Sequence, residues 1–456
     1  MFFLPGSFRD PNGGVFSDQN KIYRWISPRH EPHYRHLMDS GLYDKLVNKG
    51  WLIPHQEVKN EGFGLPPDYR VIEPEKISFI SYPYEWSFGQ YRDTAILTLK
   101  IQRLAMEHGM SLRDASAFNI QFHNGRVVFI DTTSFEILQP GRPWVAYGQF
   151  CRHFLAPLAL MACDLRLGTM MQQYADGIPL DLAYRLLPLR MKIKSGLSIH
   201  LFFHGRSGNG KNAAPPQNSL AFSPAAFQGL INSLENTLKK LTVKRQVSTW
   251  ENYYKSMIIS DDYLLKKKEI ITQWIKNIHP VYTWDLGAND ATFSRIAAEY
   301  GLTVALDSDS LAVEWGYQKV CSENISNLLP LRMDLANPSP GLGWANEERT
   351  AWLNRPLPQL TLALALVHHL VIGNNLPLAE LARFFSRISP QLIIEFIPKS
   401  DPKIREMLAF REDIFPEYHP AGFEEIFSVY FTIEEKQTIP HSERILYLMQ
   451  RKTGME

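Results

Sequence analysis

Hydrophobic and polar positions give the two halves of the chain different patterns. In the first half, "GVFSD" (14–18), "KIYRWI" (21–26) and "ISFISYPY" (77–84) have the short apolar runs of strands, whereas residues 34–50 have helical spacing. From 144 to 197 the pattern is mainly helical. A small mixed part followed by helices predicts an α+β domain.

The second half begins with two helical patterns, at 227–242 and 264–278, and then alternates between short apolar runs and amphipathic segments. The apolar runs expected as strands are "VYTWDLG" (281–287), "LTVALD" (302–307), "PLRMDL" (330–335), "LTLALAL" (360–366) and "QLIIEFI" (391–397). Helical patterns such as "ATFSRIAAEYG" (291–301) and "LAELARFFSRI" (378–388) separate them. This alternation predicts a Rossmann-like α/β domain with a doubly wound, mostly parallel sheet.

A stretch rich in Gly, Pro, Ala, Ser and Asn at 206–226 is expected to be a linker. It predicts one domain at 1–205 and a second at 227–456, the latter with a helical N-terminal extension. "GRSGNGKN" (205–212) nearly matches a phosphate-binding P-loop. Asn212 stands where that motif needs a hydroxyl for magnesium, and "AAPP" follows where a helix should begin, so we expect no P-loop.

The composition fits a globular protein and excludes some classes of function. The 456 residues carry a net charge of +1 with no long run of one sign, which disfavours a general nucleic-acid or membrane-surface binder and leaves a local basic patch open. No apolar run is long enough to span a bilayer. The three cysteines lack C-x-x-C spacing, so reduced thiols in a cytoplasmic protein are expected.

Residues 281–309 have the pattern of a nucleoside-binding site. A buried strand ends at Asp285, a tight turn with Gly287 follows, and an amphipathic helix begins. Glycine lets the backbone approach a ligand closely, and a helix N-terminus offers free N–H groups. The next strand ends at Asp307, 22 residues after Asp285, where a carboxylate can bind both ribose hydroxyls.

Two cofactors compete for this pattern. A dinucleotide site would need G-x-G-x-x-G, of which only Gly287 is present. An acid at the strand end followed by small residues fits S-adenosylmethionine (SAM) better, with Asp285 facing its positively charged methionine end.

Residues from about 228 to 456 resemble the class I SAM-dependent methyltransferases, and among them most closely the NoeA-like nodulation proteins. The segments that carry the resemblance are "DLGANDATFSRIAAEYG", "LRMDLANPSPGLGWANEER", "LALALVHHLVIGNNLPL" and "EFIPKSDPKIREMLAFREDIFPEY". The cofactor-binding residues that it implies are Asp285, Gly287, Asn289, Asp307, Ser308, Asp334 and Leu335, with Asp307 on the ribose and Asp334 near the adenine amino group. Asn289 and Ala291 stand where the family usually has glycines.

The resemblance places acceptor-side residues after the fourth strand, where His368 and His369 lie. A histidine can take a proton from a hydroxyl acceptor. Adjacent strand residues point to opposite faces, so at most one should face the pocket unless the strand has ended. Glu395 ends the next strand and would orient the acceptor. Each of the three can instead simply pack or cap a strand end. The polar insertion 337–355 is expected to form a lid or acceptor wall.

"SLRDASAFNIQFHNGRVVFID" (111–131) follows the layout of a kinase catalytic loop. Asp114 would accept a hydroxyl proton, and Asn119 and Asp131 would hold magnesium. "HNGR" predicts a hairpin turn. Residues from about 10 to 205 thus resemble the protein kinases and aminoglycoside phosphotransferases. Leu112 replaces the motif's His, Thr132-Thr133 replace Phe-Gly, no Gly-rich loop is evident, and Lys21 is the candidate for the ATP-binding lysine.

Three functions remain open at this stage. The favoured one is a SAM-dependent methyltransferase with a degenerate kinase-like module that recruits the acceptor or regulates. The second is a bifunctional enzyme that phosphorylates, with Mg-ATP, and methylates one acceptor such as a glycan terminus. The third is a non-catalytic binding protein. The expected acceptor is a small molecule or glycan, or a protein, modified on oxygen or nitrogen, and neither nucleic-acid binding nor membrane insertion is expected.

Overall fold

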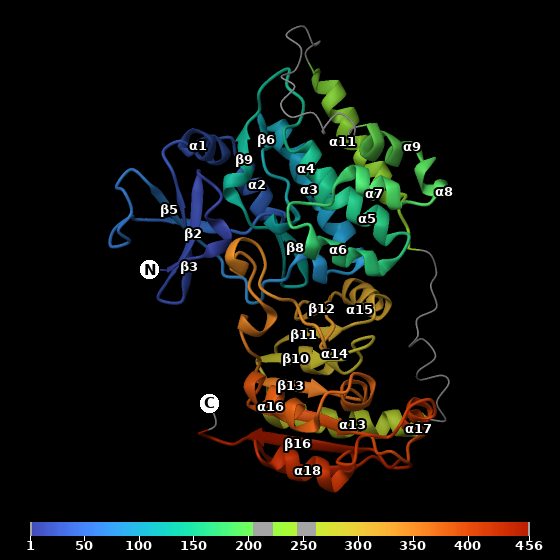
Figure 1. Cartoon of the computed structure of the whole chain (residues 1–456). Coiled ribbons are helices and arrows are strands. Elements are labelled where there is room, and N and C mark those ends of the chain that lie inside the picture. The colour runs from blue at the N-terminus through green and yellow to red at the C-terminus, as the bar shows by residue number, and fades with distance from the viewer. Residues whose placement is uncertain (1, 204–221, 244–260, 455–456) are drawn as a thin grey trace. The chain divides into compact units, whose positions relative to one another are not determined.

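The computed structural model describes residues 2–203, 222–243 and 261–454 (Figure 1). The chain forms two compact units. Unit 1 comprises Met1–Arg245 and Pro340–Ala351, and unit 2 comprises Gln246–Ser339 and Trp352–Glu456. Most of the predicted linker and all of the P-loop-like stretch lie outside the described residues. Within the described ranges, no helix is both long and apolar enough to cross a membrane.

Unit 1 begins with a five-stranded antiparallel sheet in the order β1-β2-β3-β5-β4. Its strands are β1 (Phe2–Phe3), β2 (Gly13–Asp18), β3 (Lys21–Ile26), β4 (His55–Val58) and β5 (Arg70–Pro74). The helical pattern at 34–50 forms two helices, α1 (Glu31–Asp39) and α2 (Leu42–Asn48). The break falls at Gly41, whose φ of +73° suits glycine and ends the first helix.

The strand predicted at 77–84 is wrong. This segment forms an extended loop and a short 3₁₀ turn (Pro83–Glu85), although Phe79, Tyr82 and Tyr84 are buried as a strand would require. Its backbone bonds a side chain instead of a neighbouring strand, since the Ser81 N–H donates to the Gln121 side chain and the Ser81 carbonyl accepts from it, both at 2.9 Å. The apolar content therefore reflects burial alone.

The rest of unit 1 is mostly helical. Its elements are α3 (Phe88–Glu107), β6 (Met110–Leu112), β7 (Ile120–His123), β8 (Arg126–Phe129), β9 (Phe135–Ile137), α4 (Tyr147–Phe150), α5 (Ala156–Met161), α6 (Met170–Gln173), α7 (Leu180–Leu186), α8 (Leu189–Lys192), α9 (Ser195–Leu197) and α11 (Pro224–Lys239). The predicted hairpin is confirmed, because Asn124 and Gly125 have φ of 49° and 71° between β7 and β8. Helix α11 groups with unit 1, where Glu235 pairs with Arg103, rather than with the second half.

Unit 2 confirms the predicted α/β domain. Its seven-stranded sheet has the order β12-β11-β10-β13-β14-β16-β15 (Figure 1). The strands are β10 (Tyr282–Leu286), β11 (Leu302–Asp307), β12 (Leu328–Arg332), β13 (Leu360–Ala363), β14 (Gln391–Phe396), β15 (Phe431–Thr438) and β16 (Ile445–Arg451). The first five are parallel, and β16 pairs antiparallel with β14 and β15. The strand order reverses between β10 and β13, which is where doubly wound folds bind ligands.

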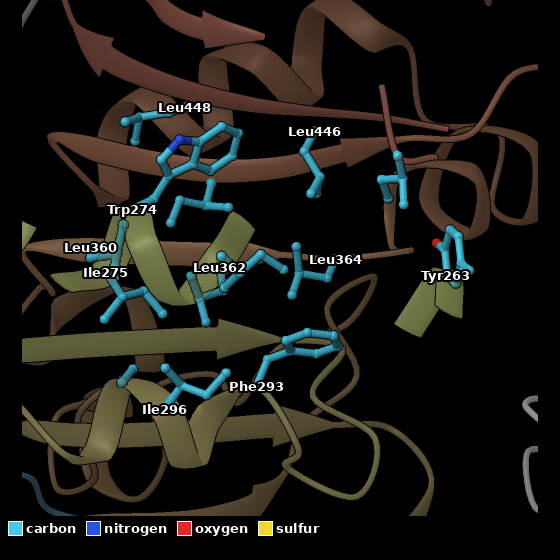
Figure 2. Close-up of a cluster of buried hydrophobic side chains, with 14 residues drawn as sticks. Tyr263, Trp274, Ile275, Phe293, Ile296, Leu360, Leu362, Leu364, Leu446 and Leu448 are labelled. Atoms are coloured by element: carbon cyan, nitrogen blue, oxygen red, sulfur yellow. The ribbon is translucent and has the colours of Figure 1, made fainter. Parts of the chain in front are cut away.

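Helices cover this sheet. They are α13 (Asp261–Ile278), α14 (Ser294–Ala298), α15 (Ser310–Glu323), α16 (Leu378–Ile388), α17 (Pro402–Leu408) and α18 (Pro420–Ser428). Figure 2 shows one core, in which Trp274 and Ile275 of α13 and Phe293 pack with Leu362 of β13 and Leu446 of β16. This core fixes α13 against the strands that carry the candidate site.

The polar insertion that was expected to form a lid belongs to unit 1 over 340–351. Glu348 forms an ion pair with Arg9 at 2.6 Å, and the Thr350 N–H donates to the Tyr82 hydroxyl at 2.8 Å. The Arg349 guanidinium lies 4.2 Å from the centre of the Phe118 ring. Residues remote in sequence therefore complete the fold of unit 1.

Candidate functional site

The candidate cofactor site of unit 2 begins at Asp285, near the carboxyl end of β10. Its side chain is buried, and one carboxylate oxygen accepts a 2.6 Å hydrogen bond from the Ser294 hydroxyl. Burial, with the nearby charge of Asp307, raises the pKa of Asp285 to about 7. A carboxylate in this state gains from a cationic ligand, which would favour its ionised form.

The turn after β10 is held in an uncommon backbone conformation. Gly287, Asn289 and Ala291 have φ of 76°, 48° and 62°, a region that non-glycine residues rarely adopt. The Gly287 and Ala288 N–H groups donate to the Leu306 carbonyl at 2.8 and 3.0 Å. The positive φ favours glycine at 287, and a Cβ added there would lie 3.2 Å from the Leu366 side chain, which would have to shift slightly. Strained turns of this kind are concentrated at ligand sites.

Asp307, at the end of β11, fixes this turn from the neighbouring strand. One of its carboxylate oxygens accepts from the Asn289 N–H and the other from the Asp309 N–H, each at 2.8 Å. Burial raises the pKa of Asp307 to about 6, even though these N–H groups lower it. The structure thus brings three predicted residues, Asp285, Asn289 and Asp307, to adjoining strand ends around one turn.

The residues predicted for the adenine end lie further along the same edge. The Met333 N–H donates to the Asp307 carbonyl at 2.8 Å, which places Asp334 just beyond β12. Asp334 and Ser308 are exposed, and Leu335 is half-buried. Asp334 accepts the Ala336 N–H at 3.0 Å, leaving its carboxylate at the surface.

His368 and His369 follow β13 after the strand has ended, with their rings 4.0 Å apart. His368 is fully buried, and within the described part of the chain neither of its ring nitrogens has a hydrogen-bond partner. Burial, then the charges of His369, Arg444 and Lys403, lowers the pKa of His368 well below its usual value. Burial also lowers the pKa of His369 to about 4. Both imidazoles are therefore neutral at physiological pH.

Glu395 is fully buried and already paired. The Lys267 ammonium donates to one carboxylate oxygen and the Tyr263 hydroxyl to the other, each at 2.7 Å. Burial raises the pKa of Glu395, but Lys267 and Arg444 outweigh it and hold that pKa below its usual value. Arg444 in turn bonds Asp401 at 2.8 Å. Glu395 is thus an ionised anchor for α13 and β16 and not a free acid or base.

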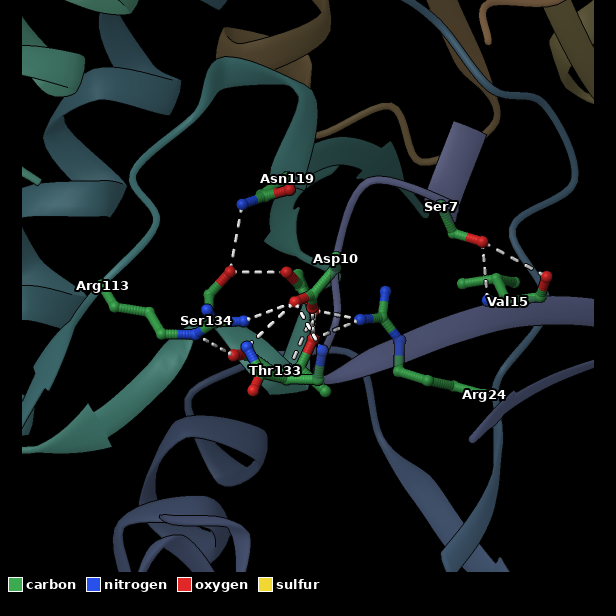
Figure 3. Close-up of polar contacts among 10 residues, drawn as sticks. Ser7, Asp10, Val15, Arg24, Arg113, Asn119, Thr133 and Ser134 are labelled. Atoms are coloured by element: carbon green, nitrogen blue, oxygen red, sulfur yellow. Dashed lines mark hydrogen bonds and ion pairs between the residues drawn. The ribbon is translucent and has the colours of Figure 1, made fainter. Parts of the chain in front are cut away.

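The second predicted site lies in unit 1, and Figure 3 shows polar contacts that involve Asn119, Thr133, Ser134 and Arg24 of this region. Asp131 accepts hydrogen bonds from the Thr133 N–H and hydroxyl at 3.0 and 2.7 Å and from the Ser134 hydroxyl at 2.6 Å, and it forms an ion pair with Arg24. Burial raises the pKa of Asp131, but Arg24 and these donors hold it below its usual value. Protein groups therefore occupy both oxygens of this carboxylate.

Two of the other three predicted members of this site, Asn119 and Asp114, lie near Asp131. The Asn119 amide donates to the Ser134 hydroxyl at 3.1 Å. Asp114 accepts from the Ser116 N–H and the Gln149 amide at 2.9 Å, and burial raises its pKa. Lys21 is not at the site, because it pairs with Glu73 at 2.8 Å. Among the described residues, no group of three or more His, Cys, Asp or Glu side chains has the geometry of a metal site.

Sequence reasoning missed two site residues, Arg24 and Lys267. Arg24 lies on the same strand as Lys21 and reaches Asp131. Lys267 lies on the buried stripe of α13 with Tyr263, Ile271 and Trp274. In both cases the signal was present as a basic residue within an apolar pattern, because such a residue needs a buried acidic partner.

Comparison with known proteins identifies the family. No family model matches the sequence. Over 460 residues the chain is 31% identical to nodulation protein NoeA of Rhizobium meliloti (strain 1021), covering 98% of this chain and 96% of that protein. This chain belongs to the NoeA family.

Solved structures resemble part of this NoeA-family protein. Magnesium protoporphyrin IX methyltransferase from Synechocystis PCC 6803 with bound SAH is 16% identical, covers 44% of this chain and 93% of its own, and has a TM-score of 0.32. The PH0226 protein from Pyrococcus horikoshii OT3 is 16% identical, covers 44% of this chain and 99% of its own, and has a TM-score of 0.31. At such values the likeness does not define an activity.

Proposed function

We propose that this NoeA-family protein is a SAM-dependent methyltransferase whose cofactor site lies in unit 2. The observation that carries the proposal is the pair of carboxylates, Asp285 and Asp307, at neighbouring strand ends around the positive-φ turn at Gly287. This turn lies where the strand order reverses, the binding position of doubly wound folds. The raised pKa values of both carboxylates add support, since a cationic ligand would favour their ionised forms.

The charges around the turn favour SAM over a dinucleotide. Asp285, Asp290 and Asp307 all lie close enough for their charges to interact, and among the described residues only Asp290 of these three has an ion-pair partner, Lys319 at 2.6 Å. A pyrophosphate beside these carboxylates would be repelled, whereas a sulfonium or ammonium group would be attracted. Asp307 would hold the ribose once a ligand competes for its oxygens.

When bound, SAM supplies an electrophilic methyl group, so the protein's part is to orient the acceptor and take its proton. His368 is the candidate for the second task because its ring nitrogens are unpaired within the described structure, although its lowered pKa makes it a weak base. Glu395 would act through structure, fixing α13 beside β14 with Lys267. A hydroxyl or amine acceptor, on a small molecule or glycan, fits a neutral base.

The kinase-like module is the second part of this proposal. The sheet followed by helices, with Asp114, Asn119 and Asp131 around one hairpin, supports a kinase-like arrangement. Arg24 occupies the carboxylate that would hold magnesium, which favours recruitment or regulation over phosphoryl transfer. The alternative, a bifunctional kinase and methyltransferase, would require Arg24 to leave Asp131 when Mg-ATP binds.

Calorimetric titration of SAM and SAH into the full chain tests methyl transfer without a known acceptor. Micromolar binding is expected for the wild type and a large loss for Asp307→Ala. Asp413→Asn is the matched control, since this acid pairs with Lys399 beyond β14 and not with a residue of the turn. No binding of either ligand to the folded wild type would rule the proposal out.

A further inference from the structure

A short segment of unit 1 combines exposed aliphatic and basic side chains. Leu186, Leu189 and Ile193 are 51%, 77% and 75% exposed, which is unusual for large aliphatic residues so close together. Most other exposed large apolar residues of the described chain are scattered, as is normal for a globular surface. This concentration therefore needs a separate explanation.

The exposed positions have a regular spacing. Adjacent aliphatic and basic residues recur every four positions at the end of α7, at the start of α8 and just after α8, with the extended residues Leu187 and Pro188 between the two helices. We define the basic apolar surface by its exposed members, Arg185, Leu186, Leu189, Arg190, Ile193 and Lys194.

Buried residues between the exposed ones hold the same segment in the fold. Ala183, Leu187 and Met191 are buried, which fixes the exposed residues outward. Arg185 pairs with Asp181, whereas no described residue forms an ion pair with Arg190 or Lys194. The outward charge is thus mostly uncompensated.

The surrounding sequence is free of acidic residues. Between Asp181 and Glu235 lie 53 residues with six basic residues and no Asp or Glu, in a chain that has 47 acidic residues among 456. Positive charge in this stretch is therefore not balanced locally, as it is in the chain as a whole. A partner that covers this surface must be negatively charged and must accept aliphatic side chains.

We propose that the basic apolar surface docks the protein on an anionic phospholipid membrane. Aliphatic side chains can enter the boundary between headgroups and acyl chains while the neighbouring Arg and Lys bind lipid phosphates. Each basic residue near an anionic bilayer strengthens binding by about fivefold. The docking is peripheral, because no described helix can span a bilayer.

Co-sedimentation of the full chain with vesicles tests this proposal. Wild-type protein should bind vesicles of phosphatidylcholine with phosphatidylglycerol and not vesicles of phosphatidylcholine alone, with binding weakened by salt. Leu189→Ser with Ile193→Ser should abolish binding, and Arg190→Gln with Lys194→Gln should weaken it by roughly 25-fold.

Matched controls change equally exposed residues elsewhere. Val281→Ser with Phe410→Ser, at 71% and 97% exposure, and Lys240→Gln with Lys268→Gln should bind vesicles as the wild type does. Light scattering of each variant reports its oligomeric state.

The proposal is overturned if the wild type ignores anionic vesicles or binds neutral ones equally well. It is also overturned if both double variants of the surface bind like the wild type. A wild-type dimer that dissociates only in Leu189→Ser with Ile193→Ser would assign the surface to self-association instead.

Discussion

Each unit has an acidic cluster at the end of a strand, but the two clusters differ in how their charge is satisfied. In unit 1, Asp131 receives an arginine and three hydrogen-bond donors from the protein. In unit 2, Asp285 receives one hydroxyl and has a pKa raised to about 7. A carboxylate whose partners are already present stabilises its own fold, and one that lacks a cation is suited to receive one.

The largest expected effect is a loss of stability when the cation of a buried ion pair is removed. The Lys267–Glu395 pair of unit 2 is more buried than the Arg24–Asp131 pair of unit 1. Lys267→Met should lower the free energy of unfolding by about 3–5 kcal/mol, because it leaves Glu395 buried and charged. Arg24→Met should cost less, since the Arg24 and Asp131 side chains are 15% and 12% exposed and Asp131 keeps three donors. Urea denaturation measures both, and Lys267→Met with Glu395→Leu should recover most of the loss. Equal losses for the two single variants would erase the distinction.

Gly287→Val should give the next largest effect, a loss of SAM affinity of about 100-fold or more from backbone strain and the contact with Leu366. Gly229→Ala is the control, because a Cβ there meets open space. Calorimetry measures the affinities. Unchanged binding in Gly287→Val would mean that SAM does not bind at this turn.

The pH dependence of SAM binding tests whether Asp285, unlike Asp131, has a raised pKa. Because a bound cation favours ionised Asp285, SAM affinity should fall by up to about tenfold per pH unit below pH 7. Without ligand the sign is opposite: the raised pKa lets the folded protein keep protons that the unfolded chain releases. Asp285 therefore destabilises the protein as pH rises from about 4 towards 7.

The difference in melting temperature between the wild type and Asp285→Asn isolates this effect from other titrating groups. The variant should gain relative stability as the pH rises and lose the pH dependence of SAM affinity above about pH 6, where Asp307 is mostly ionised. An unchanged difference between pH 5 and pH 8 would contradict a raised pKa at Asp285.

The smallest expected effect concerns magnesium and ATP. Because Arg24 and hydroxyl groups occupy Asp131, titration of Mg-ATP should give the same weak heat for the wild type and for Asp131→Ala. Arg24→Met serves as the informative second variant, since it frees one carboxylate oxygen. Strong binding by the wild type that Asp131→Ala abolishes would restore the bifunctional hypothesis.

The five parallel strands of unit 2 were predictable because each is an apolar run separated from the next by a helical pattern. The strands β15, whose sequence is mostly polar, and β16 were not among the predicted ones. Residues 378–388 form α16 as expected. Prediction failed at 77–84, where the residues are buried but do not form a strand. There the Gln121 side chain makes the hydrogen bonds that a neighbouring strand would otherwise make. It also failed for α11, whose place depends on contacts with Arg103 and not on local pattern.

The candidate site was predictable only in part. Asp285, Gly287 and Asp307 follow from strand ends and turn chemistry. The partners of Glu395 and Asp131 do not, because Lys267 and Arg24 approach them from distant elements. The partners in these two ion pairs are separated by 128 and 107 positions in the sequence. The only sequence signal for each pair is therefore a basic residue within an apolar stripe.

Residues 340–351 have a consequence for how this chain can be divided. They lie in sequence between β12 and β13, yet they complete unit 1 through Glu348 and Thr350. A gene cut between residues 245 and 246 would therefore yield a first fragment that lacks residues 340–351. The second fragment would contain them without the part of unit 1 on which they pack. The halves are not interchangeable modules, so recombination that replaced one with a foreign counterpart would leave the other incomplete.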